Sequence, residues 1–214
     1  MLMKLQILAN PGENMLVCQE EDRIVDNNSD EMILSNMNAF FKGRLALYCL
    51  LSSIDLVPGD EVILPAYTCV VVPNAVLYIG AQPVYVDIEL DSFSVNPKLV
   101  EAALSPSVKA VLCQNTYGLS AHVDEIVALC KERGIWSIED CTHGFGGTYK
   151  GKPNGSYCDA AFYSSQWNKP FSTGLGGYAL VNDAPLAPKV KAFADALPQP
   201  SLKTQAMLWA LLKV

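Results

Sequence analysis

Residues 61–87, EVILPAYTCVVVPNAVLYIGAQPVYVD, contain two short apolar segments with a longer apolar segment between them. The short segments at residues 61–64 and 82–87 are predicted as strands, and a proline stops the first of them. Residues 68–78 are predicted as a helix in spite of their β-branched side chains and an internal proline. A strand, a helix and a strand in close succession are typical of two parallel strands joined by a crossover helix.

The same alternation continues outward from this segment. Further helices are predicted at residues 44–56, 96–104 and 123–133, and further strands at residues 109–114, 135–139, 160–164 and 178–181. Gly134, directly after the last of these helices, is a common helix stop. Strands and helices that alternate with short connections predict an α/β fold of three layers, α/β/α, with a mostly parallel sheet that is covered on both faces.

The composition indicates a folded protein that binds neither nucleic acid nor membrane. Half of the 214 residues are hydrophobic, 17% are charged, and the formal net charge is −7 with no basic run. Binding to phosphate backbones needs clustered Lys and Arg, so nucleic acid is not an expected partner. No stretch reaches the roughly 18 continuous apolar residues of a membrane helix, and the first residues lack the pattern of a signal peptide.

The seven cysteines indicate a reducing compartment. Their number is odd, no CxxC pair occurs, and most of them lie in apolar segments, where a free cysteine behaves as a small hydrophobic residue. Because there are also only two histidines, a structural zinc site is not expected. We therefore expect a cytoplasmic protein without a bound metal.

An acidic residue stands where a strand of the predicted sheet ends. Ligands of open parallel sheets bind beyond the carboxyl ends of the strands, so polar residues at these points are candidate site residues. Residues 139–143, EDCTH, close the strand predicted at residues 135–139. Asp140 can therefore face into a cleft, but aspartate also commonly caps a turn. On the residues alone, both interpretations of Asp140 stay open.

A lysine follows the strand predicted at residues 160–164. It lies in the segment 164–170, SSQWNKP, and has tryptophan, proline and phenylalanine nearby. Apolar surroundings disfavour the charged form of a lysine, and a neutral lysine is the nucleophile that forms a Schiff base. An ordinary surface lysine is the commoner case, so the residues alone favour that interpretation of Lys169.

The third feature is residues 40–47, FFKGRLAL, in which Gly43 opens a predicted helix. Free backbone N–H groups at a helix start bind phosphate, although a single glycine is a weak signal and neither a P-loop nor a GxGxxG motif occurs. Together, a phosphate cradle, a carboxylate and a lysine are the parts that pyridoxal 5'-phosphate (PLP) requires. They serve its phosphate, its ring nitrogen and its aldehyde.

From about Gly43 to Asp183 the chain resembles the DegT/StrS family of PLP-dependent sugar aminotransferases, in their N-terminal cofactor-binding domain. The matching segments, in the family's order, are residues 58–68, 74–76, 80–87, 117–118, 138–140, 155–156, 162–164, 169 and 176–177. So many matches in one order are more specific than any single motif. The resemblance implies PLP as the cofactor and the large domain of the aspartate-aminotransferase type (fold type I).

The resemblance also implies roles for three polar residues. Lys169 falls at the lysine that forms the Schiff base with PLP, which reverses its interpretation as a surface lysine. Asp140 falls at the carboxylate that pairs with the pyridine nitrogen of the cofactor. His143, three residues further on, falls where the family has Gln or His near the phenolic oxygen.

Further matches concern the cofactor's phosphate and the face of its ring. Ser164, five residues before the lysine, falls at the phosphate-binding serine. Arg44 and Leu45 fall at the helix start that binds the same phosphate. Arg44 replaces a small hydroxyl residue, so either its guanidinium adds charge there or it points away while its backbone binds. Cys69 stands where many members have an aromatic residue stacked on PLP, so less cover of the ring is expected at this position.

By resemblance, the reaction is transfer of an amino group from glutamate to a nucleotide-linked keto-sugar, carried out by a homodimer. A lyase or dehydratase on the same fold is one alternative, although the family's sugar dehydratases have His in place of Lys169. A truncated, non-catalytic fragment is the other, because the chain ends inside a helix predicted at residues 201–214. We expect a PLP-binding large domain at residues 1–195, with residues 196–214 leading into an absent C-terminal domain.

Overall fold

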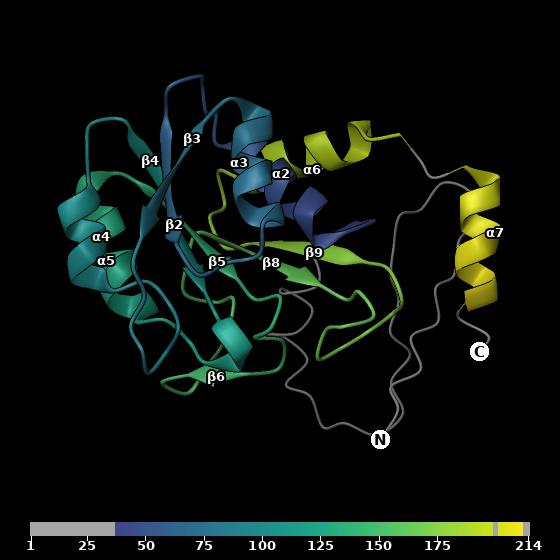
Figure 1. Ribbon diagram of the computed structural model, residues 1–214. Coiled ribbons are helices and arrows are strands. Elements are labelled where there is room, and N and C mark those ends of the chain that lie inside the picture. Colours follow the sequence, from purple (N-terminus) through teal and green to yellow (C-terminus); the bar gives the residue numbers. More distant parts are fainter. Residues whose placement is uncertain (1–36, 199–200, 212–214) are drawn as a thin grey trace.

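The computed structural model describes residues 37–198 and 201–211, which are built around one sheet (Figure 1). Residues 1–36, part of the predicted first domain, lie outside the described residues. The sheet has seven strands in the order β1-β9-β8-β5-β4-β2-β3. Their bounds are β1 Met37–Phe40, β2 Glu61–Pro65, β3 Gln82–Val86, β4 Val108–Gln114, β5 Trp136–Asp140, β8 Ala160–Ser164 and β9 Gly177–Val181. A separate small hairpin consists of β6 Thr148–Tyr149 and β7 Lys152–Pro153.

Helices cover both faces of this sheet (Figure 1). They are α2 Gly43–Ser53, α3 Val71–Ile79, α4 Pro97–Ala103, α5 Val123–Arg133 and α6 Ala187–Ala196. A short 3₁₀ helix, η1, lies at Thr116–Gly118, and α7 Leu202–Leu211 stands apart from the sheet (Figure 1). Leu47 of α2, Val76 of α3 and Val190 of α6 are buried in the core on one face. Val100 of α4 and Ile126 of α5 are buried in a second core on the other face. The predicted three-layer α/β/α fold is confirmed.

The sheet is mostly parallel, as predicted. The neighbouring pairs β3–β2, β2–β4, β4–β5 and β5–β8 are parallel, whereas β9 runs antiparallel to both β8 and β1. Gln114 at the end of β4 lies opposite Asp140 at the end of β5, and Asp140 lies opposite Phe162 of β8. The carboxyl ends of three central strands therefore meet at one edge of the sheet.

In helix α5 the local sequence determines where the helix begins and ends. Asp124 and Glu125 stand in its first turn and Lys131 and Arg133 in its last, where their charges oppose the helix dipole. Gly134 follows with a φ of 64°, and its N–H donates to the carbonyls of the last turn. A left-handed residue at this point favours glycine and closes the helix. The predicted bounds of α5 are confirmed.

The structure also differs from the predicted elements. The helix predicted at residues 68–78 begins at Val71, because residues 66–70 form a loop after β2. Strands and helices with weak patterns were not predicted: β1 exists through its pairing with distant β9, and α6 buries Val190 as its one fully buried residue. Helix α7 lies inside the helix predicted at residues 201–214, while the domain boundary stays a prediction. Among the described helices, none has the length and hydropathy to cross a membrane.

Candidate active site

Two predicted site residues end neighbouring strands and face the same side of the sheet. Side chains alternate along a strand, so Asp140 shares its face with Ile138 and Ser164 shares its face with Phe162. Ile138 and Phe162 are both buried in the core beneath α2. Asp140 and Ser164, which are only 3% and 9% exposed, therefore lie on the α2 side at the carboxyl edge. Parallel α/β sheets bind ligands at this edge.

Asp140, His143 and Lys169 lie within electrostatic range of one another. Burial raises the pKa of Asp140, while hydrogen bonds from Thr142, the charge of Lys169 and the charge that His143 carries when protonated oppose this shift. One Asp140 carboxylate oxygen accepts the Thr142 N–H at 2.9 Å. Lys169 is half-buried in the turn after β8, where its own N–H donates to the Gln166 carbonyl. The structure thus brings the predicted acid, histidine and lysine together.

His143 is held by Tyr117 of η1. The Tyr117 N–H donates to Nδ1 of His143 at 3.4 Å, and the two rings are stacked with an interplanar angle of 9°. Since Nδ1 accepts a hydrogen bond, the neutral ring carries its proton on Nε2. Burial lowers the pKa of His143 and the charge of Lys169 lowers it further, against the effect of Asp140. His143 is therefore a neutral donor at neutral pH.

The start of α2 lies directly against the end of β8. A Cβ added to Gly43 would lie 2.9 Å from Ser164 Cβ and 3.0 Å from the Tyr163 carbonyl oxygen, and one added to Gly177 would lie 2.3 Å from the Gly43 nitrogen. Only glycines allow this approach. Helix starts carry free N–H groups and a partial positive charge, so Ser164 stands beside a ready anion site. This cradle fits the phosphate of PLP.

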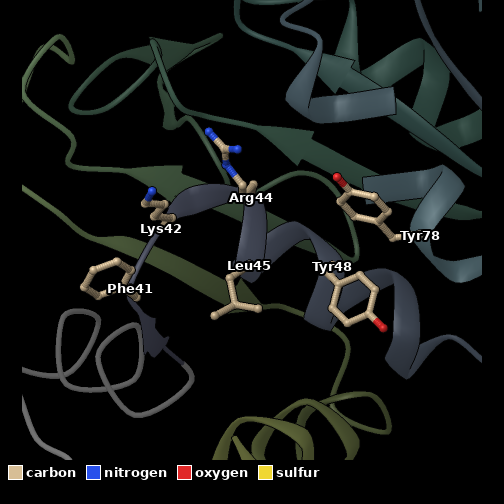
Figure 2. A pocket seen from close by; sticks show the side chains of 6 residues that line it. All are labelled: Phe41, Lys42, Arg44, Leu45, Tyr48 and Tyr78. Carbon is tan, nitrogen blue, oxygen red and sulfur yellow. The ribbon is translucent and has the colours of Figure 1, made fainter. Parts of the chain in front are cut away.

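Arg44 and Leu45, the two residues predicted at this helix start, differ in the direction of their side chains and in whether their backbone N–H is free. Figure 2 shows Arg44 and Leu45 projecting to opposite sides of α2. Leu45 packs against the core, and its N–H already donates to the Lys42 carbonyl at 3.0 Å. Arg44 is exposed, and its N–H precedes the first hydrogen bond of the helix. Within the described residues, the free N–H groups of this start are therefore those of Gly43 and Arg44.

Figure 2 also shows an open hollow beside the helix start. It is lined by Phe41, Lys42, Arg44, Leu45, Tyr48 and Tyr78. The side chain of Arg44 additionally borders α3, near Asn74 and Tyr78. Asp140, His143 and Lys169 are not among these lining residues. The Arg44 side chain thus lines this hollow on the side of α3, and the interpretation in which its backbone faces the phosphate stays a prediction.

The loop after β2 carries Cys69, and Gln114 fastens this loop to β4. Thr68 Oγ1 donates to Gln114 Oε1, and Gln114 Nε2 donates to the Tyr67 carbonyl at 3.2 Å. Cys69 is exposed at the start of α3. Gln114 and Tyr117 were missed as site residues, although Gln114 is the last residue of β4 and Tyr117 follows it closely. The rule that selected Asp140, a polar residue at a strand's carboxyl end, also selects Gln114.

The apolar surroundings predicted for Lys169 are only partly present. Trp167 is 56% exposed and packs against Gly174, where an added Cβ would lie 3.2 Å from its ring. Lys169 itself is half-buried. The surroundings of Lys169 are therefore partly exposed to solvent.

We predict that Gly43→Ala destabilises the chain and weakens PLP binding. Alanine is the better helix former, so without the contact to Ser164 the change would be stabilising. The contact at 2.9 Å reverses the sign, and overpacking of this kind costs about 1–3 kcal/mol. Thermal unfolding and a PLP titration measure the two effects. Ser52→Ala, farther along α2, is the matched control, and a Gly43→Ala protein as stable as this control would contradict the close approach.

The chain is similar in sequence to known proteins. The sequence model of the DegT/DnrJ/EryC1/StrS aminotransferase family matches residues 37–203. The chain is 36% identical over 179 residues to UDP-2-acetamido-2-deoxy-3-oxo-D-glucuronate aminotransferase of Pseudomonas aeruginosa, covering 83% of the chain and 49% of that protein. It is also 36% identical over 144 residues to GDP-perosamine synthase of Escherichia coli O157:H7, covering 67% of the chain and 40% of that protein.

A solved structure is similar as well. Ntda from Bacillus subtilis with bound cofactor PMP superposes with a TM-score of 0.67 at 32% sequence identity, over 72% of this chain and 35% of that one. The chain spans less than half the length of the curated relatives named above.

Proposed function

Because the chain belongs to the DegT/DnrJ/EryC1/StrS aminotransferase family, we propose that it forms the PLP site of an enzyme that aminates a nucleotide-linked keto-sugar. The grouping of Asp140, His143 and Lys169 at one sheet edge carries this proposal, since each acts electrostatically on another. The cradle of Gly43 and Ser164 supports it, because a PLP site also needs a phosphate-binding corner.

Each polar group of the site has a distinct task in this proposal. The N–H groups of Gly43 and Arg44 and the hydroxyl of Ser164 would hold the phosphate. Asp140 would accept a hydrogen bond from the protonated ring nitrogen, and His143 would donate its Nε2 proton to the phenolic oxygen. These contacts orient the cofactor before any substrate arrives, which is the preorganisation on which electrostatic catalysis depends.

Proton transfer would fall to Lys169. When bound, PLP supplies the electron sink that stabilises the carbanion of the amino donor. The Nζ of Lys169 would take the proton from the donor's α-carbon and deliver it to the carbon atom of the cofactor's aldehyde group. Asp140 is buried, so its charge acts through little water and keeps the ring nitrogen protonated.

The names of the relatives support the proposed class of acceptor. One relative is named for a UDP-linked 3-oxo-sugar acid and another for GDP-perosamine, which both contain a nucleotide-linked sugar. We propose a nucleotide-linked keto-sugar as acceptor and glutamate as donor. We further propose that the protein works as a cytoplasmic homodimer, and the free state of the six described cysteines suits a reducing compartment.

Glutamate labelled with ¹⁵N in its amino group tests the proposed reaction. The protein, PLP and a panel of UDP-, GDP- and TDP-linked keto-sugars should yield a ¹⁵N-amino sugar nucleotide together with 2-oxoglutarate. An eliminated or dehydrated sugar without ¹⁵N would instead indicate lyase or dehydratase chemistry. Cofactor binding without any conversion of glutamate would contradict the aminotransferase proposal while leaving the PLP site intact.

A further inference from the structure

Glu139 is a buried carboxyl group that the proposed reaction does not use. It directly precedes Asp140 on β5, so the two side chains point to opposite faces of the sheet. Asp140 lies on the α2 side, whereas Glu139 lies on the opposite side and is only 1% exposed. No ion pair involves Glu139 among residues 37–198 and 201–211. A buried, unpaired carboxylate would be costly.

One oxygen of Glu139 and the side-chain oxygen of its partner Asn115 have no hydrogen-bond partner in the described part of the chain. Glu139 Oε1 accepts from Asn115 Nδ2 at 2.8 Å and from Cys141 Sγ at 3.4 Å. Glu139 Oε2 and Asn115 Oδ1 are the two buried side-chain atoms of the described residues that have no hydrogen-bond partner. Both atoms are acceptors if Glu139 is ionised. Both are satisfied if Glu139 carries a proton on Oε2 and donates it to Asn115 Oδ1.

The groups around Glu139 are uncharged. They are Cys113 of β4, Cys141, Cys158 and Tyr163 of β8. Burial raises the pKa of Cys141 and of Tyr163. The hydrogen bond with Cys113 and burial together raise the pKa of Cys158. Neutral thiols and a neutral phenol provide no charge that would hold Glu139 in its ionised form.

Burial raises the pKa of Glu139 itself. The side chain of Asn115 opposes this shift without reversing it, as do the thiol of Cys141 and the backbone N–H groups of Gly155 and Tyr157, which lie near Glu139 but do not meet hydrogen-bond geometry with Oε2. Asn115 fits tightly in its place, because a Cβ on Gly144 would lie 2.8 Å from both Asn115 Cβ and Nδ2. The absence of a side chain at Gly144 therefore leaves the room that the Asn115 amide occupies beside Glu139.

We propose that Glu139 is a neutral carboxylic acid that forms a ring of two hydrogen bonds with the side-chain amide of Asn115, and that this pair is a positioning device for Asp140. The backbone N–H of Asn115 donates to the backbone carbonyl of Asp140 at 3.0 Å. Two residues later, the Tyr117 N–H reaches His143 Nδ1. The Glu139–Asn115 pair thus joins the ends of β4 and β5 beneath the acid and the histidine of the site.

A neutral Glu139 also affects the charge of the neighbouring Asp140. Two ionised carboxyl groups on adjacent residues would repel each other and disfavour the anion at Asp140. With Glu139 protonated, Asp140 is the one carboxylate at this end of β5. This functional consequence rests on the proposed role of Asp140 in PLP binding, whereas the protonation and hydrogen bonding of Glu139 do not.

Infrared spectroscopy of the cofactor-free protein at neutral pH tests the protonation state. The wild type should show the C=O stretching band of a protonated carboxyl group, and Glu139→Gln should lose it. Asp140→Asn and Glu61→Gln are the matched controls, because Asp140 is a second buried carboxyl group and Glu61 accepts a hydrogen bond from Ser105. A band of unchanged intensity in Glu139→Gln would overturn the proposal. No band in the wild type, as for a carboxylate bound to a buried water, would overturn it as well.

Stability as a function of pH gives a second, independent test. The pKa of Glu139 is raised in the folded state, whereas an unfolded glutamate titrates near about 4.3. The folded state keeps this proton while the unfolded state releases it, so the stabilisation is fully present below the unfolded value and is lost as pH rises through the folded pKa. Within this window, each pH unit should raise the unfolding constant of the wild type about tenfold relative to Glu139→Gln. Parallel pH profiles would contradict a proton on Glu139.

The positioning role is tested with two substitutions of Glu139 and the resonances of the two histidines. Gln retains both hydrogen bonds of a neutral acid, whereas Ala removes them. Glu139→Ala should shift the ring resonances of His143 and weaken PLP binding, while Glu139→Gln should preserve both. His122, which pairs with Glu89 on the surface, is the internal reference. If Gln disturbs His143 as much as Ala does, or if Ala leaves it unchanged, Glu139 does not position this site.

Discussion

Replacing Lys169 with alanine should abolish the covalent link between this chain and PLP, together with the absorption band near the visible edge that the link produces. The Nζ of Lys169 is the amine that we place beside the cofactor's aldehyde, within electrostatic range of Asp140 and His143. Without this nucleophile, neither attachment nor proton transfer has a substitute in the proposed site. Transamination should fall to the background rate.

Borohydride reduction followed by peptide mass analysis locates the link. In the wild type, the fixed cofactor should be found on the peptide that contains Lys169. Lys98→Ala is the matched control, because Lys98 is an exposed lysine on α4, at the opposite face of the sheet. A reduced adduct on another lysine in the Lys169→Ala protein would refute the assignment. An unchanged fold of that variant, measured by circular dichroism, keeps the result specific to the lysine.

The central fold was predictable from sequence because its signals are local. Helix α5 carries its own charge pattern and its own glycine stop, and β2, α3 and β3 follow one another within a single short segment. Strand β1 had no such signal. Its four residues become a strand only by pairing with β9, as in the register of Met37 with Leu180. A contact over that sequence distance leaves no periodicity for a local pattern to detect.

The site residues that lie at or just after the carboxyl ends of strands were predictable. Asp140 and Lys169 were identified by that rule together with the family resemblance, and the structure places them in one cluster. The tight approach of Gly177 to Gly43 could not be read from the sequence, because it depends on how β9 lies beneath α2. The pairing of Glu139 with Asn115 was missed for the same reason, since it joins two different strand ends.

Replacing Asp140 with asparagine should separate stability from function. In the proposed site, Asp140 keeps the ring nitrogen of PLP protonated, and asparagine has no charge with which to do so. We expect each transamination half-reaction to slow by about 10²-fold or more, comparable to the loss of one preorganised electrostatic contact. Stopped-flow measurement with glutamate and PLP-loaded protein gives this rate. Asp91→Asn, an exposed aspartate, is the control.

The same substitution should not destabilise the cofactor-free chain, and at neutral pH we expect it to stabilise it. Burial raises the pKa of Asp140 above the value of about 3.9 in an unfolded chain. Between these two values, the folded state loses stability as pH rises, because the unfolded state releases its proton first. Asparagine removes this loss and can still accept the Thr142 N–H. A less stable Asp140→Asn protein without PLP, or one that keeps the wild-type rate with PLP, would show that Asp140 is a structural residue. The opposite signs of the two effects are expected for a carboxylate whose burial is only partly compensated by Lys169 and whose ionised form serves a cationic group of the cofactor.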